Sequence, residues 1–428
     1  MRSPFGKKRV ISRYEHDVVR SPREISQPQF AALARYHEST QSKCFSLGYN
    51  SIKLNQYVGV IQVGDTVIEV LPKIDRTPDY DGYPRWRRTL LEMLEVCHKI
   101  TPRDVGSAHQ TTRHHSLLDI ILDRYLGLVS ILLQQGMVRR YIDNECNVSA
   151  LKGRILFSQH LSRNLIRPDR WYTHHTIYDR NHQLHGMLKR AVEIAYESGS
   201  SHVRHRARLI AQEFADYDSF TPTQKYMGRL RFNRKTERYR GAVDMAWLII
   251  RSYTPDFFAG GNPVIALMFD MNRLYEETVY HLLATYCRRY RNSVDVSFKN
   301  GTEFWQSMRL QPDIILKSGS TTVVIDTKWK RPSKDLPSAN DLRQVFTYNL
   351  YYGSNQAVLL YPGNTDRLGR DGTFRPTVTI PEHVHSCQVR FATLNDTDGH
   401  LSSEFAPALL SDLIPEEEVD TVFPGPFS

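Results

Sequence analysis

The sequence lacks long hydrophobic runs. Its best apolar stretch, Leu126 to Met137, is interrupted by Ser130, Gln134 and Gln135, whereas a membrane-spanning helix needs roughly 18 or more consecutive apolar residues. The first 13 residues are basic but contain no apolar segment of the kind that a secretory signal requires. These absences argue against a polytopic membrane protein and predict that the protein works without a membrane partner.

Cysteine is scarce. The five cysteines are dispersed and never form a CxxC pattern, which disfavours a disulfide framework or a structural zinc site and favours a reducing cytoplasm. The alternation of His383, His385 and Cys387 suits zinc, but no fourth ligand lies nearby in the sequence. The sequence also has no GxSxG elbow and no GxxxxGK[ST] loop. An acyl-transfer enzyme is therefore a poor fit, and the chain carries no P-loop of its own.

The composition is that of a globular protein with excess positive charge. Of the 428 residues, 40% are hydrophobic and 24% are charged, and the length suits about three domains or two large ones. There are 56 Lys and Arg residues against 46 Asp and Glu, a net charge of +10. This excess favours a polyanionic partner, most commonly nucleic acid, although a solvated basic surface gives the same balance.

Hydrophobic patterning divides the chain into three parts. Residues 1–110 are expected to be rich in strands, with a hairpin formed by Tyr57–Val63 and Thr66–Ile74. Residues 111–260 are expected to be mainly helical and basic, and to end near Gly260-Gly261-Asn262-Pro263. Residues 261–428 alternate expected helices, at about 271–291 and 340–352, with strands at about 294–298, 310–316, 321–326 and 357–361. The predicted fold class is multidomain α+β or α/β.

Two acids and a lysine meet at one expected hairpin. Asp313 lies in one expected strand, and the adjacent strand would bring Asp326 near it. Asp326 and Lys328 are two residues apart at the end of that second strand, so the side chains of these two residues share a face. Carboxylates are the ligands that Mg²⁺ prefers, and a lysine can orient water or neutralise charge during phosphodiester hydrolysis. The backbone carbonyl of Thr327 could add a ligand. The simpler alternative is a hairpin with three surface charges.

The flanking helices favour the metal-site interpretation. Glu276 or its neighbour Glu277, on the preceding helix, can supply a further carboxylate. Gln344 and Tyr348, four residues apart on the following helix, share a face and can steady the attacking water or the phosphate. The order of these elements makes a specific composite pattern.

That composite resembles the PD-(D/E)xK nuclease superfamily, and the wider sequence resembles the McrC family of nuclease subunits from 5-methylcytosine-type restriction systems. The resemblance covers about residues 50–362. It rests on the acids, Lys328, Gln344 and Tyr348, and on segments at 57–64, 68–74, 136–141, 151–155, 178–181 and 271–277. It implies a restriction-endonuclease-like mixed sheet flanked by helices in residues 261–428. It assigns nothing to residues 1–50 or 363–428.

The resemblance also implies roles. Glu276, Asp313 and Asp326 correspond to Mg²⁺ ligands, and Lys328 to the catalytic lysine. The substrate would be double-stranded DNA. The partner would be a ring-forming AAA+ GTPase like McrB, with the docking surface in residues 1–110. DNA target, methylation dependence, the partner's nucleotide and the number of metal ions stay open.

A basic segment is a candidate DNA contact. Within residues 225–240, aromatic residues interleave with cations, and the candidates are Arg229, Arg231, Arg234, Lys235 and Arg238, together with Lys330 beside the catalytic lysine. A solvated face or a contact with an acidic partner would explain the segment equally well. For the whole chain, two other functions remain: a non-cleaving adaptor that activates the NTPase, or a nuclease that works alone.

Overall fold

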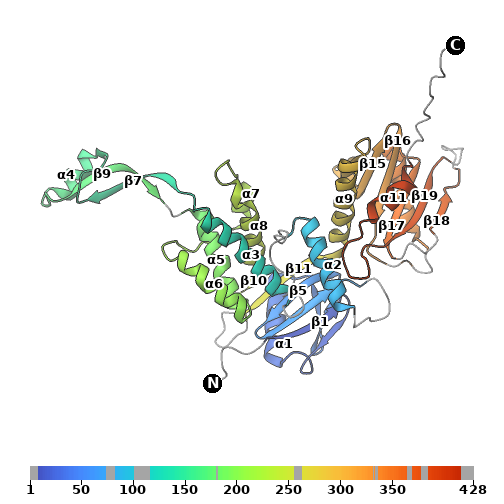
Figure 1. Cartoon of the computed structure of the whole chain (residues 1–428), viewed down its shortest axis with the longest axis horizontal. Coiled ribbons are helices and arrows are strands. Elements are labelled where there is room, and N and C mark those ends of the chain that lie inside the picture. Colours follow the sequence, from blue (N-terminus) through green and yellow to red (C-terminus); the bar gives the residue numbers. More distant parts are fainter. Residues whose placement is uncertain are drawn as a thin grey trace, which may run out of the picture. The chain divides into compact units, whose positions relative to one another are not determined.

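A computed structural model describes residues 8–73, 82–100, 116–179, 182–254, 263–330, 332, 336–363, 369–376 and 384–415 of the chain. The chain forms two compact units, each assembled from segments that are distant in sequence (Figure 1). The first unit combines Met1–Val10, Ile61–Val67 and Thr101–Leu267, and the second combines Ile11–Val60, Ile68–Ile100 and Met268–Ser428. The division at residues 110 and 260 stays a prediction, and residues 260–262 lie outside the described residues.

A five-stranded sheet has the order β1-β6-β5-β11-β10. Its strands are β1 (Arg9–Tyr14), β5 (Tyr57–Val63), β6 (Thr66–Leu71), β10 (Tyr253–Thr254) and β11 (Val264–Asp270). Almost every residue of β5 and β6 is buried, which explains why both strands are continuous β-branched runs without a polar face. The predicted strands at 57–63 and 66–74 are confirmed as neighbours as far as Leu71.

The first unit contains a group of helices. They are α3 (Leu117–Gln134), α5 (Gln183–Ser198), α6 (Ser201–Glu213), α7 (Gln224–Arg229), the 3₁₀ turn η1 (Glu237–Tyr239) and α8 (Arg240–Ser252). Ser116 caps α3 by accepting a hydrogen bond from the backbone N–H of Asp119, and Gly136 beyond its end adopts a φ of +81°. The helices predicted at 114–135 and 182–197 are therefore confirmed within the described residues.

Between α3 and α5 the chain forms a β-ribbon, residues 140–179, instead of the predicted helices. It consists of β7 (Arg140–Val148), β8 (Arg154–Ile155) and β9 (Trp171–Asp179), with the short helix α4 (Phe157–Asn164) between β8 and β9. Strands β7 and β9 pair antiparallel along their whole length. The prediction of helices here is wrong because the strands carry polar residues on both faces, so they show no alternation of apolar and polar residues.

The N-terminal part of the second unit contains a small sheet and two helices. Strands β2 (Val18–Arg20), β4 (Ser51–Leu54) and β3 (Phe45–Gly48) are neighbours in that order. Helix α1 (Gln27–Thr40) begins with a capping box between Ser26 and Gln29, and α2 (Tyr83–Val96) packs against α9 (Met271–Tyr290). This N-terminal part and the C-terminal residues therefore belong to one unit.

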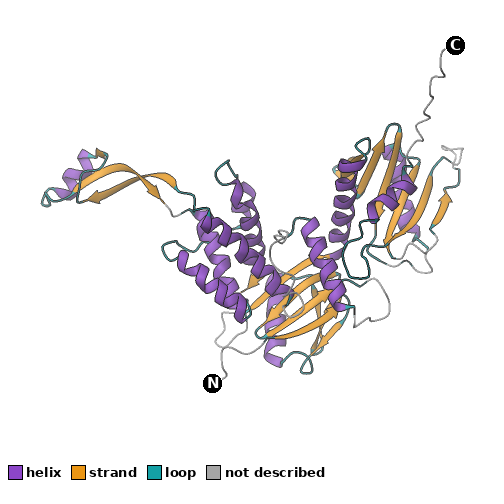
Figure 2. Ribbon diagram, in the orientation of Figure 1, coloured by secondary structure: helices purple, strands orange, loops and turns teal. Residues whose placement is uncertain are grey.

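The C-terminal part of the second unit is a six-stranded mixed sheet (Figure 2). Its order is β12 (Asp295–Phe298), β15 (Ile314–Ser318), β16 (Thr321–Thr327), β17 (Gln356–Pro362), β19 (Ser386–Ala392) and β18 (Arg370–Thr373). Strands β16, β17 and β19 are parallel, whereas the other neighbours are antiparallel. Helix α10 (Ala339–Tyr352) packs on β16, β17 and β19, and α11 (Phe405–Leu413) packs on α9. A small hairpin, β13 (Thr302–Trp305) and β14 (Met308–Leu310), precedes Asp313.

The tail that received no assignment from the sequence thus supplies β18, β19 and α11.

No helix in the described ranges is long and apolar enough to cross a membrane. All five cysteines are free. His383, one of the three residues of the zinc alternative at 383–387, lies outside the described residues.

Candidate active site

The hairpin of β15 and β16 brings Asp313 and Asp326 together. Ile314 pairs with Ile325 in the antiparallel register, so the preceding Asp313 lies beside the following Asp326. The backbone N–H and the hydroxyl of Thr327 both donate to Asp313 Oδ2, at 2.8 and 3.0 Å. The sequence prediction that the two acids are adjacent is therefore confirmed.

Lys328 faces the same site. Its Nζ lies 2.7 Å from Asp326 Oδ2, and the Asp326 side chain is only 2% exposed. Nζ also donates to Gln344 Oε1 at 3.2 Å. The two-residue spacing at the end of β16 thus places a carboxylate and an ammonium group on one face.

Burial and mutual repulsion shift the titration of these groups. Burial, and then the charge of Asp326, raise the pKa of Asp313 to about 6. Burial also raises the pKa of Asp326, against the attraction of Lys328. For Lys328, burial alone would lower the pKa, but Asp326 and Asp313 raise it above its ordinary value. A divalent cation would relieve the repulsion between the two carboxylates.

Helix α9 settles which glutamate faces the acids. Glu276 pairs with Lys299 at 2.6 Å, and its pKa is raised by burial and by the charge of Asp313. Both oxygens of Glu277 are held instead, by Lys99 at 2.7 Å and by Arg273 at 2.8 Å. Burial would raise the pKa of Glu277, but these two cations lower it. Glu276 is therefore the candidate ligand, and Glu277 does not replace it.

Lys299 is a site residue that the sequence interpretation missed. It follows β12, and because Phe298 pairs with Ile314, Lys299 lies opposite Asp313. Its backbone N–H donates to the Asp313 carbonyl at 2.9 Å. Lys299 could have been found only from the pairing of β12 with β15, which brings it opposite Asp313. The sequence does not specify that pairing.

Gln344 and Tyr348 reach the site together from α10. Gln344 Nε2 donates to the Tyr348 hydroxyl at 2.8 Å, and that hydroxyl donates to the Gln311 carbonyl at 3.3 Å. Gln344 accepts from Lys328 through its other end. The i, i+4 spacing therefore produces a chain of hydrogen bonds that fixes the orientation of the lysine.

The donor chemistry of the site fits a hard divalent cation. Asp313, Asp326 and Glu276 present carboxylate oxygens whose pKa values are raised by burial first and by neighbouring carboxylates second. Within the described ranges no three acidic, histidine or cysteine side chains converge closely enough to form a ready-made metal site. Lys328 and Lys299 act as counter-ions to these acids. The carbonyl of Thr327 stays a predicted ligand.

The candidate DNA-contact residues have different surroundings. Arg229, Arg234 and Lys235 are exposed in the first unit. The guanidinium groups of Arg231 and Arg238 donate to backbone carbonyls, those of Gly228 and Leu230 for Arg231 and those of Gln135 and Gly136 for Arg238. Lys330, in the second unit, pairs with Asp341 at 2.8 Å.

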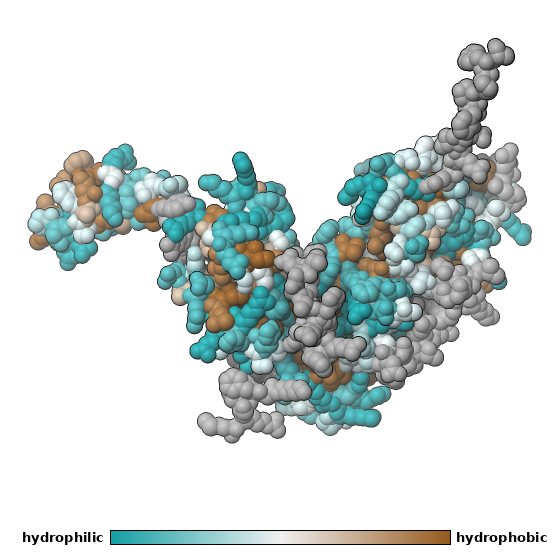
Figure 3. Space-filling view, viewed as in Figure 1, coloured by the Kyte–Doolittle hydropathy of each residue, from teal (hydrophilic) through white to brown (hydrophobic). Residues whose placement is uncertain are grey.

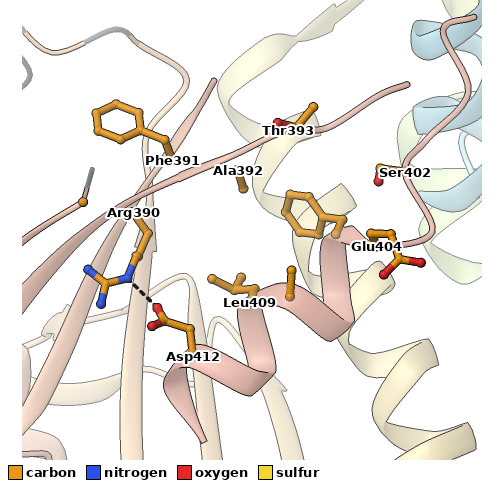
Figure 4. Close-up of a pocket in the computed structure, with 11 residues that line it drawn as sticks. Arg390, Phe391, Ala392, Thr393, Ser402, Glu404, Leu409 and Asp412 are labelled. Atoms are coloured by element: carbon orange, nitrogen blue, oxygen red, sulfur yellow. Dashed lines mark hydrogen bonds and ion pairs between the residues drawn. The ribbon is translucent and has the colours of Figure 1, made fainter. Parts of the chain in front are cut away.

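A surface groove of about 480 Å³ lies away from the acids, between β19 and α11 (Figure 4). Its lining includes Phe405 and Leu409 of α11 and Arg390 of β19, whose guanidinium group pairs with Asp371 and Asp412. Strand β17 separates β19 from β16, which carries Asp326. The groove is therefore not part of the acid site.

A family model described as a McrBC 5-methylcytosine restriction system component matches residues 52–362. The fold is similar to a chain in a refined half-complex from the tetradecameric assembly of Thermococcus gammatolerans McrB AAA+ hexamers with bound McrC. That match has a TM-score of 0.69 and 18% identity, and covers 94% of this chain and 100% of that chain.

A chain in a cryo-EM structure of the Thermococcus gammatolerans McrBC complex matches with a TM-score of 0.51 and 19% identity, covering 66% of this chain and 89% of that one. These structural similarities establish a shared fold. No curated protein matches the sequence.

Proposed function

The chain belongs to the family of McrBC 5-methylcytosine restriction system components, and we propose that it is the DNA-cleaving subunit, a Mg²⁺-dependent endonuclease that works on a ring-forming AAA+ GTPase. The observation that carries the proposal is the meeting of Asp313, Asp326 and Lys328 at the end of β16. The six-stranded mixed sheet that holds them supports assignment to the PD-(D/E)xK nucleases.

Each residue has a role that follows from its chemistry. Asp313, Asp326 and Glu276 would hold Mg²⁺, which would supply Lewis-acid activation and charge neutralisation at the scissile phosphate. Lys328, oriented by Gln344, would place its ammonium group where negative charge develops and would orient the attacking water. Tyr348 holds Gln344 in place from the same helix.

The surface of the β-ribbon supports the proposal of a protein partner. Five large apolar side chains at its α4 end are exposed, by 55% to 92%: Leu151, Phe157, Leu161, Leu165 and Ile166. Apolar side chains are visible on the surface of the ribbon in Figure 3. Clustered exposed apolar side chains mark interaction surfaces.

A chain of similar fold belongs to an assembly of AAA+ hexamers with bound McrC. We therefore place the docking surface for the ring on the ribbon end, rather than in residues 1–110 as the family resemblance implied. Under this proposal the ring selects the DNA, and the second unit cleaves it.

The test is cleavage of double-stranded DNA by the purified chain with Mg²⁺, with and without the AAA+ partner and its nucleotide. We expect Lys328→Ala to abolish cleavage. Lys317, exposed on β15 at the opposite end of the hairpin, provides the matched control, and Lys317→Ala should cleave as the wild type does. Equal cleavage by Lys328→Ala would refute the site. Stimulated NTPase activity without any cleavage would establish the adaptor instead.

A further inference from the structure

Trp329 lies between the two lysines at the end of β16 and is only 9% exposed. Its ring packs against Tyr275, with the ring centroids 5.2 Å apart, and Tyr275 precedes the candidate ligand Glu276 on α9. The backbone N–H of Lys328 donates to Leu360 on β17 at 2.9 Å. The indole is thus linked to β16, which carries Asp326, and to α9, which carries Glu276.

The indole is held by a residue far away in the sequence. Trp329 Nε1 donates to Glu15 Oε1 at 2.7 Å, across 314 residues. Glu15 directly follows β1 and is 1% exposed. Its Oε1 also accepts from the backbone N–H of Lys73 at 2.8 Å, and its own N–H donates to the Leu71 carbonyl at 3.1 Å. The strands of the N-terminal part therefore fix this carboxyl group rigidly.

Charge pairing does not explain the burial of Glu15. Among the described residues Oε2 accepts no hydrogen bond, and the His16 imidazole lies 3.9 Å from it; the charge of Lys73 lowers the pKa of Glu15 but less than burial raises it. Burial raises the pKa of Glu15 to about 7 despite the donors on Oε1. Glu69 on β6 is equally buried, but it is paired with the guanidinium group of Arg87. Burying a carboxyl group without a full set of partners costs free energy, so Glu15 is poorly explained by a contribution to stability.

We propose that Glu15 is a positioning residue that fixes the Trp329 indole, and through it the end of β16 that carries Lys328. The inference rests on the proposed nuclease function. It extends the active site beyond the C-terminal residues, because the N-terminal part of the second unit would then help to set the geometry of cleavage.

The test compares Glu15→Ala, Glu15→Gln, Trp329→Phe and the double variant Glu15→Ala/Trp329→Phe in the full-length chain with its partner. The Gln carbonyl oxygen can accept the same two N–H groups, so Glu15→Gln should stay within about threefold of wild type. Glu15→Ala and Trp329→Phe should each lower kcat about tenfold with KM unchanged. The double variant should be no worse than Trp329→Phe alone, because both changes remove one interaction.

Glu69→Gln is the matched control, since it removes a buried carboxylate from the same β-region without touching Trp329. It should lower thermal stability and leave kcat unchanged. Additive effects of Glu15→Ala and Trp329→Phe, or a loss in Glu15→Gln equal to that in Glu15→Ala, would overturn the proposal. Equal losses of kcat in Glu69→Gln and Glu15→Ala would also overturn it, because a general loss of stability would then suffice.

Two readouts are independent of cleavage. Subtracting the emission of Trp329→Phe from that of wild type isolates the fluorescence of Trp329, which should shift in Glu15→Ala and not in Glu69→Gln. The affinity for Mn²⁺ alone, measured by electron paramagnetic resonance, should fall severalfold in Glu15→Ala and stay unchanged in Glu69→Gln. If the wild type does not cleave DNA, the nuclease proposal fails, and these two measurements still decide the role of Glu15. An unchanged spectrum and unchanged affinity would overturn it.

Discussion

Protein chains usually expose charged groups and bury apolar ones. The end of β16 departs from this by burying charge, and the end of the β-ribbon departs from it by exposing apolar side chains. At β16, charged groups are buried: Asp326 is 1% exposed and lies beside Asp313 and Lys328. At the ribbon end, large apolar groups are exposed, and Ile166 reaches 92%. Buried charge and clustered exposed apolar surface both cost free energy in an isolated chain. The contrast is consistent with the two proposed roles, chemistry for the first region and association for the second.

The largest expected effect comes from Asp313→Asn, which should lower cleavage by about 10³-fold or more because one metal ligand loses its charge. In the absence of metal, the same change should stabilise the fold at pH 7. Asn can still accept from Thr327, and the repulsion with Asp326 disappears. A shift of two pKa units corresponds to roughly 3 kcal/mol. We expect about 1 kcal/mol, because surrounding groups adjust.

The raised pKa of Asp313 determines how the stability of the fold should change with pH. The pKa of Asp313 in the folded chain, about 6, is above its ordinary value of 3.8, so the folded state binds more protons between these values. Wild-type stability should fall as pH rises from 4 to 6, and the advantage of Asp313→Asn should be absent at pH 4 and full at pH 7. Urea unfolding in EDTA at both values measures it. An advantage at pH 4 equal to that at pH 7 would contradict the electrostatic explanation.

Ile166→Asp tests the other side of the comparison. A charge at the centre of an apolar contact should weaken binding to the AAA+ partner about 30-fold or more, since the carboxylate must be desolvated. Leu209 on α6 is also exposed, by 52%, and Leu209→Asp is the control. Sedimentation measures the association. Equal binding of Ile166→Asp and wild type would remove the ribbon end from the interface, and the N-terminal residues would regain priority.

These two regions also differ in how far the sequence foretold them. Asp313, Asp326 and Lys328 fall within one hairpin, and Gln344 and Tyr348 within one helical turn, so local periodicity alone brings each set together. Among the described side chains of the ribbon's strands, only Tyr172 and Thr173 are buried. Because these neighbours point to opposite faces, the alternating hydrophobic pattern that predicts a strand was missing. Lys299 and Glu15 join the site through pairings distant in sequence, which periodicity cannot supply.

The adjacent glutamates Glu276 and Glu277 on α9 allow a direct comparison between a carboxylate proposed to bind metal and one that stabilises the fold. Glu276→Gln should lower Mn²⁺ affinity about tenfold with little loss of stability, because the pKa of Glu276 is raised by burial and by Asp313. Glu277→Gln should leave Mn²⁺ affinity unchanged and cost about 1 to 2 kcal/mol. That is below the 3–5 kcal/mol typical of a fully buried pair, because Lys99 is 33% and Arg273 70% exposed. Titration calorimetry and thermal unfolding distinguish the two, and a reversed pattern would exchange their roles.

The smallest effect concerns the basic segment, whose charges are neither buried nor apolar. Arg234 and Lys235 are exposed. If both contact phosphates, replacing them with Ala should lower the slope of log K against log[salt] by about 2, since each phosphate contact contributes roughly 0.9. Binding at low salt should weaken severalfold for every DNA sequence, because phosphate contacts do not discriminate between bases. Arg208, exposed on α6, gives the control in Arg208→Ala. An unchanged slope together with weaker partner binding would show that the segment contacts protein instead, and the comparison would then gain a second association surface, one made of charge.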